Sequence, residues 1–301
     1  MGLLLDQFNL LVFIEEKQQT ELSTDYIAAE TFLTEEKVIQ NLEEFLRDGL
    51  IEKVKGHYLM TKKGYDCLEP YRVKKALFMA AGFGSRMVPV TINTPKPLIR
   101  VNGKPIIETL LDAVLRAGIE DITIVRGYLG EQFDLLLPKY PMIKFIDNPV
   151  YDRTNNISSA FYLKDLMEDA YVLESDLLLY NQRLIRKYEY STNYLGMKVE
   201  YTDDWCFRTK NGIIRELLVG GRDVYHMFGI SFWNKEDAKK MSLDIPKVYN
   251  SEGGKQKYWD EVALRDCTEN YQIMVRPVQK GDIFEIDTFE ELKALDHTYA
   301  G

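Results

Sequence analysis

The 301-residue chain has few of the residues that support disulfide-bonded or zinc-dependent folds. It contains three cysteines, Cys67, Cys206 and Cys267, and no Cys-x-x-Cys pair. Their wide spacing argues against a disulfide framework and against a zinc site. Free thiols are typical of a reducing compartment, so we expect a cytoplasmic location.

The chain also lacks an apolar run long enough to span a bilayer. Its first residues, MGLLLDQFNLLVFIEEKQQ, form an apolar stripe, but Asp6 comes early and no basic region precedes the stripe. This pattern predicts an amphipathic helix near Leu3 to Glu16 rather than a signal peptide. We therefore expect no membrane partner.

An excess of positive charge and a covalent-catalysis motif are missing as well. The net charge is -9, whereas a general nucleic-acid binder needs a basic surface. None of the three histidines, His57, His226 and His297, has a serine or cysteine partner in a recognisable motif. His226 begins the apolar run HMFGISFW, and we interpret it as structural.

The chain divides by pattern into residues 1–72 and residues 73–301. The first part contains three helical segments. The third, EEKVIQNLEEFL, is preceded by Thr34 and followed by Gly49, which is typical of the residue after a helix. LIEKVKGHYLMT then predicts a hairpin that turns at Gly56. Three helices followed by a two-stranded wing resemble the winged helix-turn-helix domains of bacterial regulators.

The charge of residues 1–72 argues against the DNA binding that this resemblance implies. The segment has 14 acidic and 8 basic side chains, a balance of -6. The third helix has two basic residues, Lys37 and Arg47. It also has several carboxylates, which would approach the DNA phosphates if the helix entered a groove. Those carboxylates belong to Glu35, Glu36, Glu43, Glu44 and Asp48. We expect this domain to contact a protein partner, to self-associate or to regulate its neighbour.

From residue 73 onward, apolar strand patterns alternate with helical ones. The strand patterns are ALFMA, DITIVRG, MIKFID and AYVLESD, and the helical ones include KPIIETLLDAVLRAG and LGEQFDLLLPKY. This alternation predicts an α/β fold with a doubly wound, mainly parallel sheet. In such sheets the site lies at the carboxyl ends of the strands. The loop after ALFMA is therefore where we expect a ligand.

This loop, AAGFGSRMVPVTINTPKPL, is rich in features that suit phosphate groups. Its Gly-x-Gly turn lets the backbone come close to a ligand, and Arg86 and Lys96 carry positive charge. A dinucleotide fingerprint needs a third glycine where Met87 stands, and the Gly-Lys-Ser/Thr of a P-loop is missing. The glycines alone also fit an ordinary tight turn between a strand and a helix.

The complete pattern is far more specific, and it resembles the signature that opens the nucleotidyltransferase family. The matching residues are Ala80, Ala81, Gly82, Gly84, Ser85, Arg86, Pro89, Thr91, Pro95 and Lys96. The resemblance implies that the glycine loop wraps a nucleotide and that Arg86 and Lys96 contact its phosphates. IVRGYLGEQFD and DNPVYDRTNNISSA resemble segments of bacterial CTP:phosphocholine cytidylyltransferases, which implies nucleotide-binding roles for Gly127, Tyr128, Asn156 and Ser158.

Two Glu-x-Asp pairs stand at predicted strand ends. Glu174 and Asp176 end one strand, and Glu285 and Asp287 end another, so each pair points to one side. Carboxylates gathered in this way are hard oxygen ligands suited to Mg²⁺. The resemblance implies that Asp176, Glu285 and Asp287 hold this cofactor, with Glu174 in support.

Aromatic residues predict the second substrate. TDDWCF and KQKYWDEV resemble the choline-recognition segments of the phosphocholine enzymes, and they supply Trp205, Tyr258 and Asp260. A quaternary ammonium donates no hydrogen bonds, so aromatic faces and a nearby carboxylate hold it. The resemblance therefore implies a reaction of CTP with phosphocholine that gives CDP-choline and pyrophosphate.

Two alternatives stay open at the level of sequence. The same chemistry would serve a sugar 1-phosphate or phosphoethanolamine in place of phosphocholine. The chain would otherwise be a winged-helix regulator whose transferase-like domain senses nucleotide. The complete loop and both acidic pairs favour an enzyme over the regulator.

Overall fold

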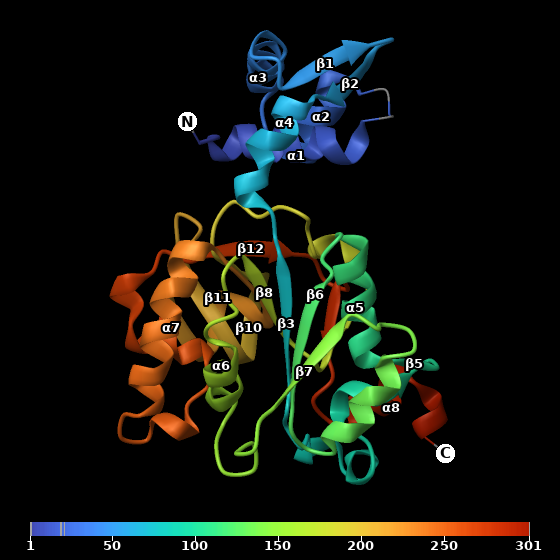
Figure 1. Cartoon of the computed structure of the whole chain (residues 1–301), viewed down its shortest axis with the longest axis vertical. Helices are drawn as coiled ribbons and strands as arrows, with labels where there is room; N and C mark the ends of the chain where they lie inside the picture. The colour runs from blue at the N-terminus through green and yellow to red at the C-terminus, as the bar shows by residue number, and fades with distance from the viewer. Residues whose placement is uncertain (1, 19, 21, 301) are drawn as a thin grey trace. The chain divides into compact units, whose positions relative to one another are not determined.

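The computed structural model describes residues 2–18, 20 and 22–300, and these divide into two compact units. The first unit extends to Arg72 and also includes Tyr188–Tyr190. The second unit comprises Val73–Lys187 and the chain from Ser191 onward. Figure 1 shows the elements of both units.

The first unit consists of helices and one small hairpin. Its elements are α1 (Leu5–Lys17), α2 (Thr24–Thr31), α3 (Glu35–Arg47), β1 (Ile51–Val54), β2 (His57–Met60) and α4 (Lys62–Leu68). The Thr34 hydroxyl accepts a hydrogen bond from the Lys37 N–H and so caps α3, and Gly49 takes the left-handed conformation just after this helix. The order of helices and hairpin is the expected one, while the winged-helix assignment stays a prediction.

A short segment from the middle of the chain completes the core of this unit. The Tyr190 ring stacks on Tyr71 at 5.6 Å and lies 5.4 Å from Phe8, measured between ring centroids. The Tyr190 hydroxyl donates a hydrogen bond to the Leu3 carbonyl at 3.1 Å. The sequence division between residues 72 and 73 did not foresee this contribution, because pairing between distant segments leaves no local pattern.

The second unit is built on a seven-stranded sheet within the described residues, in the order β10-β12-β11-β8-β3-β6-β7. These strands are β3 (Lys75–Ala80), β6 (Asp121–Arg126), β7 (Ile143–Asp147), β8 (Ala170–Glu174), β10 (Asn193–Lys210), β11 (Ile213–Trp233) and β12 (Met274–Val278). β3 pairs in parallel with β6 and β8, and β6 with β7, whereas β11 runs antiparallel to β8 and β10. The predicted α/β fold with a mainly parallel sheet is confirmed.

Helices cover both faces of this sheet, because successive residues of a buried strand point to opposite sides. In β3, Phe78 belongs to the core with the residues of α5 (Ile106–Arg116). Leu77 belongs to the other core, with the residues of α6 (Ile157–Leu163) and α7 (Lys235–Tyr249). β3 ends between these two layers, so the loop that follows it starts at the edge of the sheet (Figure 1).

The predicted helix in LGEQFDLLLPKY is shorter and tighter than expected. Residues Gly130–Leu136 form a 3₁₀ helix. Its buried residues Gly130, Phe133 and Leu136 recur every three positions, which is the period of a 3₁₀ helix.

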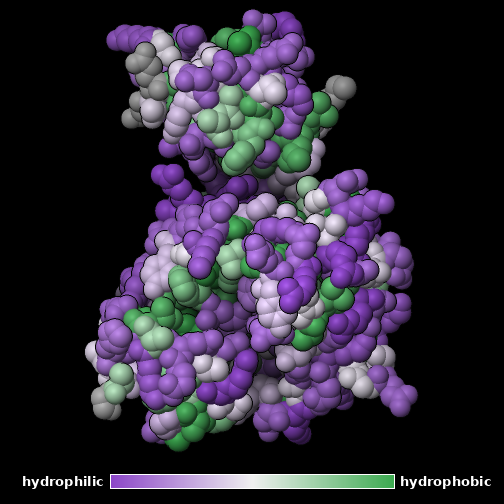
Figure 2. All heavy atoms as spheres, turned by 180° about the vertical axis from the view of Figure 1, so that it is seen from behind, coloured by the Kyte–Doolittle hydropathy of each residue, from purple (hydrophilic) through white to green (hydrophobic). Residues whose placement is uncertain are grey.

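Smaller elements complete the second unit. They are β4 (Arg100–Val101), β5 (Lys104–Pro105), β9 (Leu177–Leu179), β13 (Ile283–Glu285) and α8 (Phe289–Leu295). One face of the molecule is largely hydrophilic, with small hydrophobic groups between (Figure 2). In the described part of the chain, every helix is too short or too polar to cross a bilayer.

Candidate active site

A cavity of about 550 Å³ opens where β3 and β8 end. It brings together segments that are more than 200 residues apart in sequence. Of the predicted site residues, its wall contains Ala80, Ala81, Gly82, Gly84, Ser85, Arg86, Lys96, Asn156, Ser158, Asp176, Trp205, Tyr258, Asp260, Glu285 and Asp287. Only this tertiary arrangement joins the glycine loop, the acidic pairs and the aromatic residues in one site.

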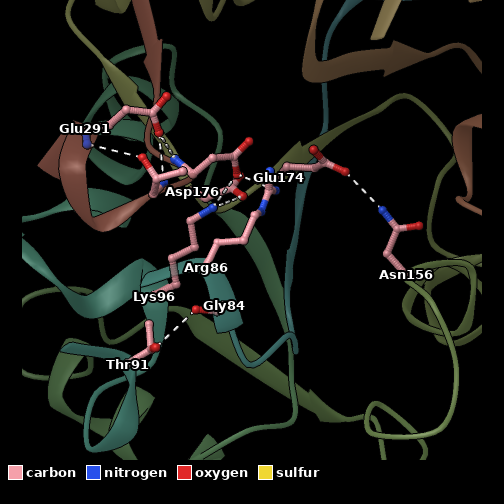
Figure 3. Close-up of polar contacts among 10 residues, drawn as sticks. Gly84, Arg86, Thr91, Lys96, Asn156, Glu174, Asp176 and Glu291 are labelled. Carbon is pink, nitrogen blue, oxygen red and sulfur yellow. Dashed lines mark hydrogen bonds and ion pairs between the residues drawn. The ribbon is translucent and has the colours of Figure 1, made fainter. Parts of the chain in front are cut away.

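The glycine loop folds back onto the segment that follows it. Gly84 has a φ of +68°, a left-handed conformation that favours glycine. A Cβ at this position would come within 3.0 Å of the Lys96 Cβ. The Thr91 hydroxyl donates a hydrogen bond to the Gly84 carbonyl at 3.1 Å (Figure 3). The close packing at Gly84 therefore places Lys96 directly against the loop.

Gly127 and Tyr128 lie behind this loop, and neither is among the described residues that line the cavity. The Tyr128 N–H donates to the Ala81 carbonyl at 3.0 Å, and its hydroxyl donates to the Ile92 carbonyl at 2.6 Å. A Cβ on Gly127 would meet the Ala81 carbonyl oxygen at 2.8 Å. Both residues contact the backbone of the loop, and their predicted contact with nucleotide stays a prediction.

Two basic side chains connect the loop to the acidic pairs. The Lys96 Nζ lies 2.7 Å from the Asp176 carboxylate and 2.9 Å from that of Asp287. Arg86, which is largely exposed, pairs with Asp287 at 2.8 Å. Burial by itself would lower the pKa of Lys96, but the charges of Asp176 and Asp287 outweigh it and raise that pKa. Lys96 therefore stays charged at the centre of the site (Figure 3).

Strand pairing brings the two acidic pairs together. β13 runs antiparallel to β9, and Glu285 stands opposite Leu177, the residue after Asp176. One carboxylate oxygen from each of Glu174, Asp176 and Glu285 lies within 4.8 Å of the other two. Burial, reinforced by the neighbouring carboxylates, raises the pKa of Glu174 and of Glu285 well above the ordinary range.

This group of carboxylates fits a divalent cation. The Asp176 Oδ2 accepts a hydrogen bond from Lys96, while its Oδ1 is buried and has no hydrogen-bond partner in the described part of the chain. An unpaired carboxylate oxygen on a residue that lies close to two further carboxylates suits a hard cation such as Mg²⁺. Glu174 occupies the place in this group that the sequence predicted for Asp287. Asp287 instead contacts Lys96 and Arg86, and its role as a ligand stays a prediction.

Asn156 and Ser158 begin the helix on the opposite side of the cavity. The Asn156 Nδ2 donates to the Glu174 carboxylate at 3.1 Å (Figure 3), and its Oδ1 accepts from the Trp259 N–H at 2.8 Å. The Ser158 hydroxyl accepts from the Asn148 Nδ2 at 2.9 Å. Asn156 therefore orients a member of the acidic group. Asn148 was not singled out from the sequence, although it is the second residue of the quoted segment DNPVYDRTNNISSA.

The predicted choline residues form one wall of the cavity. The rings of Trp205 and Tyr258 meet edge to face, 5.3 Å apart between centroids. Asp260 is buried and accepts a hydrogen bond from the Tyr194 hydroxyl at 2.9 Å. Burial raises the pKa of Asp260 to about 7. The guanidinium of Arg265 lies 5.5 Å from the centroid of the Trp205 ring, a cation–π contact with that ring.

Two polar residues near the site were missed by the sequence analysis. Asp204 lines the cavity beside Trp205, and His226, interpreted as structural, lies near it. One ligand atom from each of Asp204, His226 and Glu285 lies within 4.8 Å of the other two. Burial lowers the pKa of His226, against the charges of Asp204 and Asp203. The spacing of these three residues in the sequence gives no sign of the group, because each residue belongs to a different strand.

Comparison with known proteins identifies the class of enzyme that carries this fold and site. Residues 75–188 match the family described as nucleotidyl transferase. A 2-aminoethylphosphonate cytidylyltransferase of Lancefieldella rimae is 38% identical over 228 residues, which are 74% of this chain and 92% of the relative. The chain therefore belongs to the nucleotidyl transferase family, and it is an enzyme of that class.

Two further comparisons narrow the activity. A choline-phosphate cytidylyltransferase of Streptococcus pneumoniae is 31% identical over 74% of this chain and 96% of the relative. The solved structure of the CTP:phosphocholine cytidylyltransferase from that organism superposes with a TM-score of 0.70 at 32% identity, over 75% of this chain and 99% of the other. These relatives support cytidylyl transfer to a phosphorylated substrate.

Proposed function

We propose that the chain transfers CMP from CTP to phosphocholine, with Mg²⁺ as cofactor, and releases pyrophosphate. The observation that carries this proposal is the aromatic wall. Trp205 and Tyr258 line the same cavity as the phosphate loop. Two aromatic rings beside a buried carboxylate suit a cation that offers no hydrogen-bond donor. A sugar 1-phosphate would instead need polar groups that match its hydroxyls.

The chain's own residues supply binding and alignment. A phosphate oxygen of phosphocholine is anionic at neutral pH, so its attack on the α-phosphorus of CTP needs no general base. Arg86 and Lys96 would hold the triphosphate and the departing pyrophosphate, and the aromatic wall would aim the incoming phosphate for in-line attack. Glu174, Asp176 and Glu285 would hold Mg²⁺, which supplies positive charge against the phosphate oxygens when bound.

A second candidate substrate is 2-aminoethylphosphonate. The relative from Lancefieldella rimae, named for this substrate, shares 38% identity with the chain. Asp204 and Asp260 line the cavity next to the aromatic wall, and their carboxylates could accept hydrogen bonds from a primary ammonium. Phosphoethanolamine has the same ammonium group and belongs to the same test.

The test is pyrophosphate release from the purified chain with Mg²⁺, each NTP and each candidate acceptor. We expect release with CTP and phosphocholine. Turnover confined to 2-aminoethylphosphonate or phosphoethanolamine would mean that the reaction is correct but the substrate is not phosphocholine. Turnover with a sugar 1-phosphate would show that the aromatic wall does not select a cationic substrate. Tyr258→Ala should raise KM for phosphocholine about tenfold or more, since stacking with a cation contributes on the order of 1–2 kcal/mol. Tyr201→Ala, an exposed tyrosine outside the cavity wall, is the matched control.

For the first unit we propose a protein contact in a cytoplasmic enzyme rather than DNA binding. Both basic side chains of α3 are paired with acids, Lys37 with Asp6 and Arg47 with Asp48. Ile39 and Leu46, which lie on the same helix, are 44% and 38% exposed. Neutralised cations and exposed apolar groups suit a protein surface better than a phosphate backbone. Tight, sequence-selective binding in a gel-shift assay at low salt would contradict this proposal.

A further inference from the structure

The cavity wall has more acidic than basic side chains. Its basic residues are Arg86 and Lys96, and both are already paired with carboxylates. The acidic residues that line it are Glu174, Asp176, Asp204, Asp260, Glu285 and Asp287. A triphosphate adds further negative charge, and burial already raises the pKa of Glu174, Asp260 and Glu285. Cations would therefore be needed to keep these carboxylates ionised in a partly buried space.

A second set of ligands adjoins the proposed Mg²⁺ group. Glu285 belongs to both sets: on one side it lies with Glu174 and Asp176, and on the other with Asp204 and His226. A carboxylate between two such sets can bridge two cations, as in two-metal sites that act on phosphate esters. The second set differs from the first because it contains an imidazole.

Local structure fixes the two new ligands. Opposite β11, the register of β10 shifts between Thr202 and Trp205, so that Asp203 and Asp204 face the single residue Gly220. Such a bulge redirects a side chain, here that of Asp204, which lines the cavity. The Trp205 N–H donates to the Asp204 Oδ1 at 2.7 Å, which leaves Oδ2 as the oxygen to offer a cation.

Thr202 holds both residues through one hydroxyl oxygen. This oxygen accepts a hydrogen bond from the Asp204 N–H at 3.2 Å and lies 3.1 Å from the His226 Nδ1. If Nδ1 carries the ring proton and donates it to Thr202, the lone pair is on Nε2. Metal-binding histidines are commonly oriented by such a hydrogen bond from the other ring nitrogen.

We propose that Asp204, His226 and Glu285 bind a second divalent cation, of the transition-metal class that accepts nitrogen ligands. The proposal extends the proposed function, since Glu285 is shared with the Mg²⁺ group. One imidazole and two carboxylates suit Mn²⁺, which takes both ligand types, whereas Mg²⁺ favours oxygen alone.

The test measures retention of Mn²⁺ by the metal-free full chain in excess Mg²⁺, read by electron paramagnetic resonance. We expect the wild type to retain about one Mn²⁺ per chain and His226→Gln to retain almost none. Asp176→Asn, which alters only the Mg²⁺ group, should retain it as the wild type does. Equal retention by wild type and His226→Gln, or loss in Asp176→Asn with its fold intact, would overturn the proposal.

A second measurement keeps the test valid if His226→Gln does not fold. The chain has three histidines, so the double variant His57→Gln/His297→Gln keeps His226 alone. Mn²⁺ bound to this variant should show hyperfine coupling to an imidazole ¹⁴N, and absence of that coupling would refute the site. Neither measurement uses CTP or an acceptor, so failure of the proposed reaction would be seen separately, in the pyrophosphate assay.

Discussion

Glu174-Ser175-Asp176 and Glu285-Ile286-Asp287 have the same spacing at two strand ends, yet their aspartates have different surroundings. Asp176 gives one oxygen to Lys96 and keeps the other buried without a hydrogen-bond partner among the described residues. Asp287 accepts from both Lys96 and Arg86 through one oxygen. The comparison teaches that an identical motif can leave one aspartate with a buried, unpaired oxygen and give the other two basic partners.

The largest effect is expected from Asp176→Asn. The change removes the anionic oxygen that we assign to Mg²⁺ and keeps nearly the same shape, so turnover should fall about 100-fold or more while the fold stays intact. Pyrophosphate release and circular dichroism measure the two quantities. Activity near that of the wild type would remove the metal assignment.

A similar but smaller loss is expected from Lys96→Met. Lys96 is the basic side chain that contacts both aspartates, so its removal leaves these carboxylates without their shared cation and takes away the ammonium group that we assign to the phosphates. We expect kcat/KM for CTP to fall on the order of 100-fold. Lys104→Met, which breaks the pair with Asp112, is the control and should change kcat/KM little.

Asp287→Asn distinguishes the two motifs most directly. If Asp287 serves to hold Lys96 and Arg86, its loss misplaces these side chains without removing a metal ligand, and kcat should fall only about tenfold. The affinity for Mn²⁺ or Mg²⁺ should stay near that of the wild type. A loss of activity and metal affinity equal to that of Asp176→Asn would show that the two motifs act alike.

The smallest effect concerns stability. The pKa of Glu174 is raised in the folded state, so its contribution to stability is fully present below its ordinary value of 4.5 and is lost as the pH rises through the folded-state pKa. Without divalent cations at neutral pH, Glu174→Gln should therefore raise Tm by on the order of a few degrees. The difference from wild type should shrink as the pH falls towards 4.5.

Glu168→Gln is the matched control for this measurement. The hydrogen bond from Lys235 lowers the pKa of Glu168, so its loss should not stabilise the chain at neutral pH. Equal Tm values for wild type and Glu174→Gln across the pH range would contradict the electrostatic account of the acidic group.

The sequence predicted the segments of the site better than their contacts. The pattern around Gly84, Arg86 and Lys96 indicated a phosphate loop because glycine conformations and charge are local properties. The pairing of Asp287 with Arg86 was not predictable, since these residues are 201 positions apart. Tyr128 was predicted to contact nucleotide, and that contact stays a prediction; its hydrogen bonds to Ala81 and Ile92 were not foreseen, because a sequence segment does not specify which neighbours a residue contacts.

By itself, the sequence determined the alternation of strands and helices, the mainly parallel sheet and the place of the glycine loop after β3. These features depend on periodicity and turn chemistry within a few residues. Only the tertiary structure decided which carboxylates meet. Antiparallel pairing of β13 with β9 places Glu285 beside Asp176. Asp204, from the bulge in β10, and His226, from β11, lie near the same carboxylate. Such proximity depends on strand register between distant segments, which no local pattern encodes.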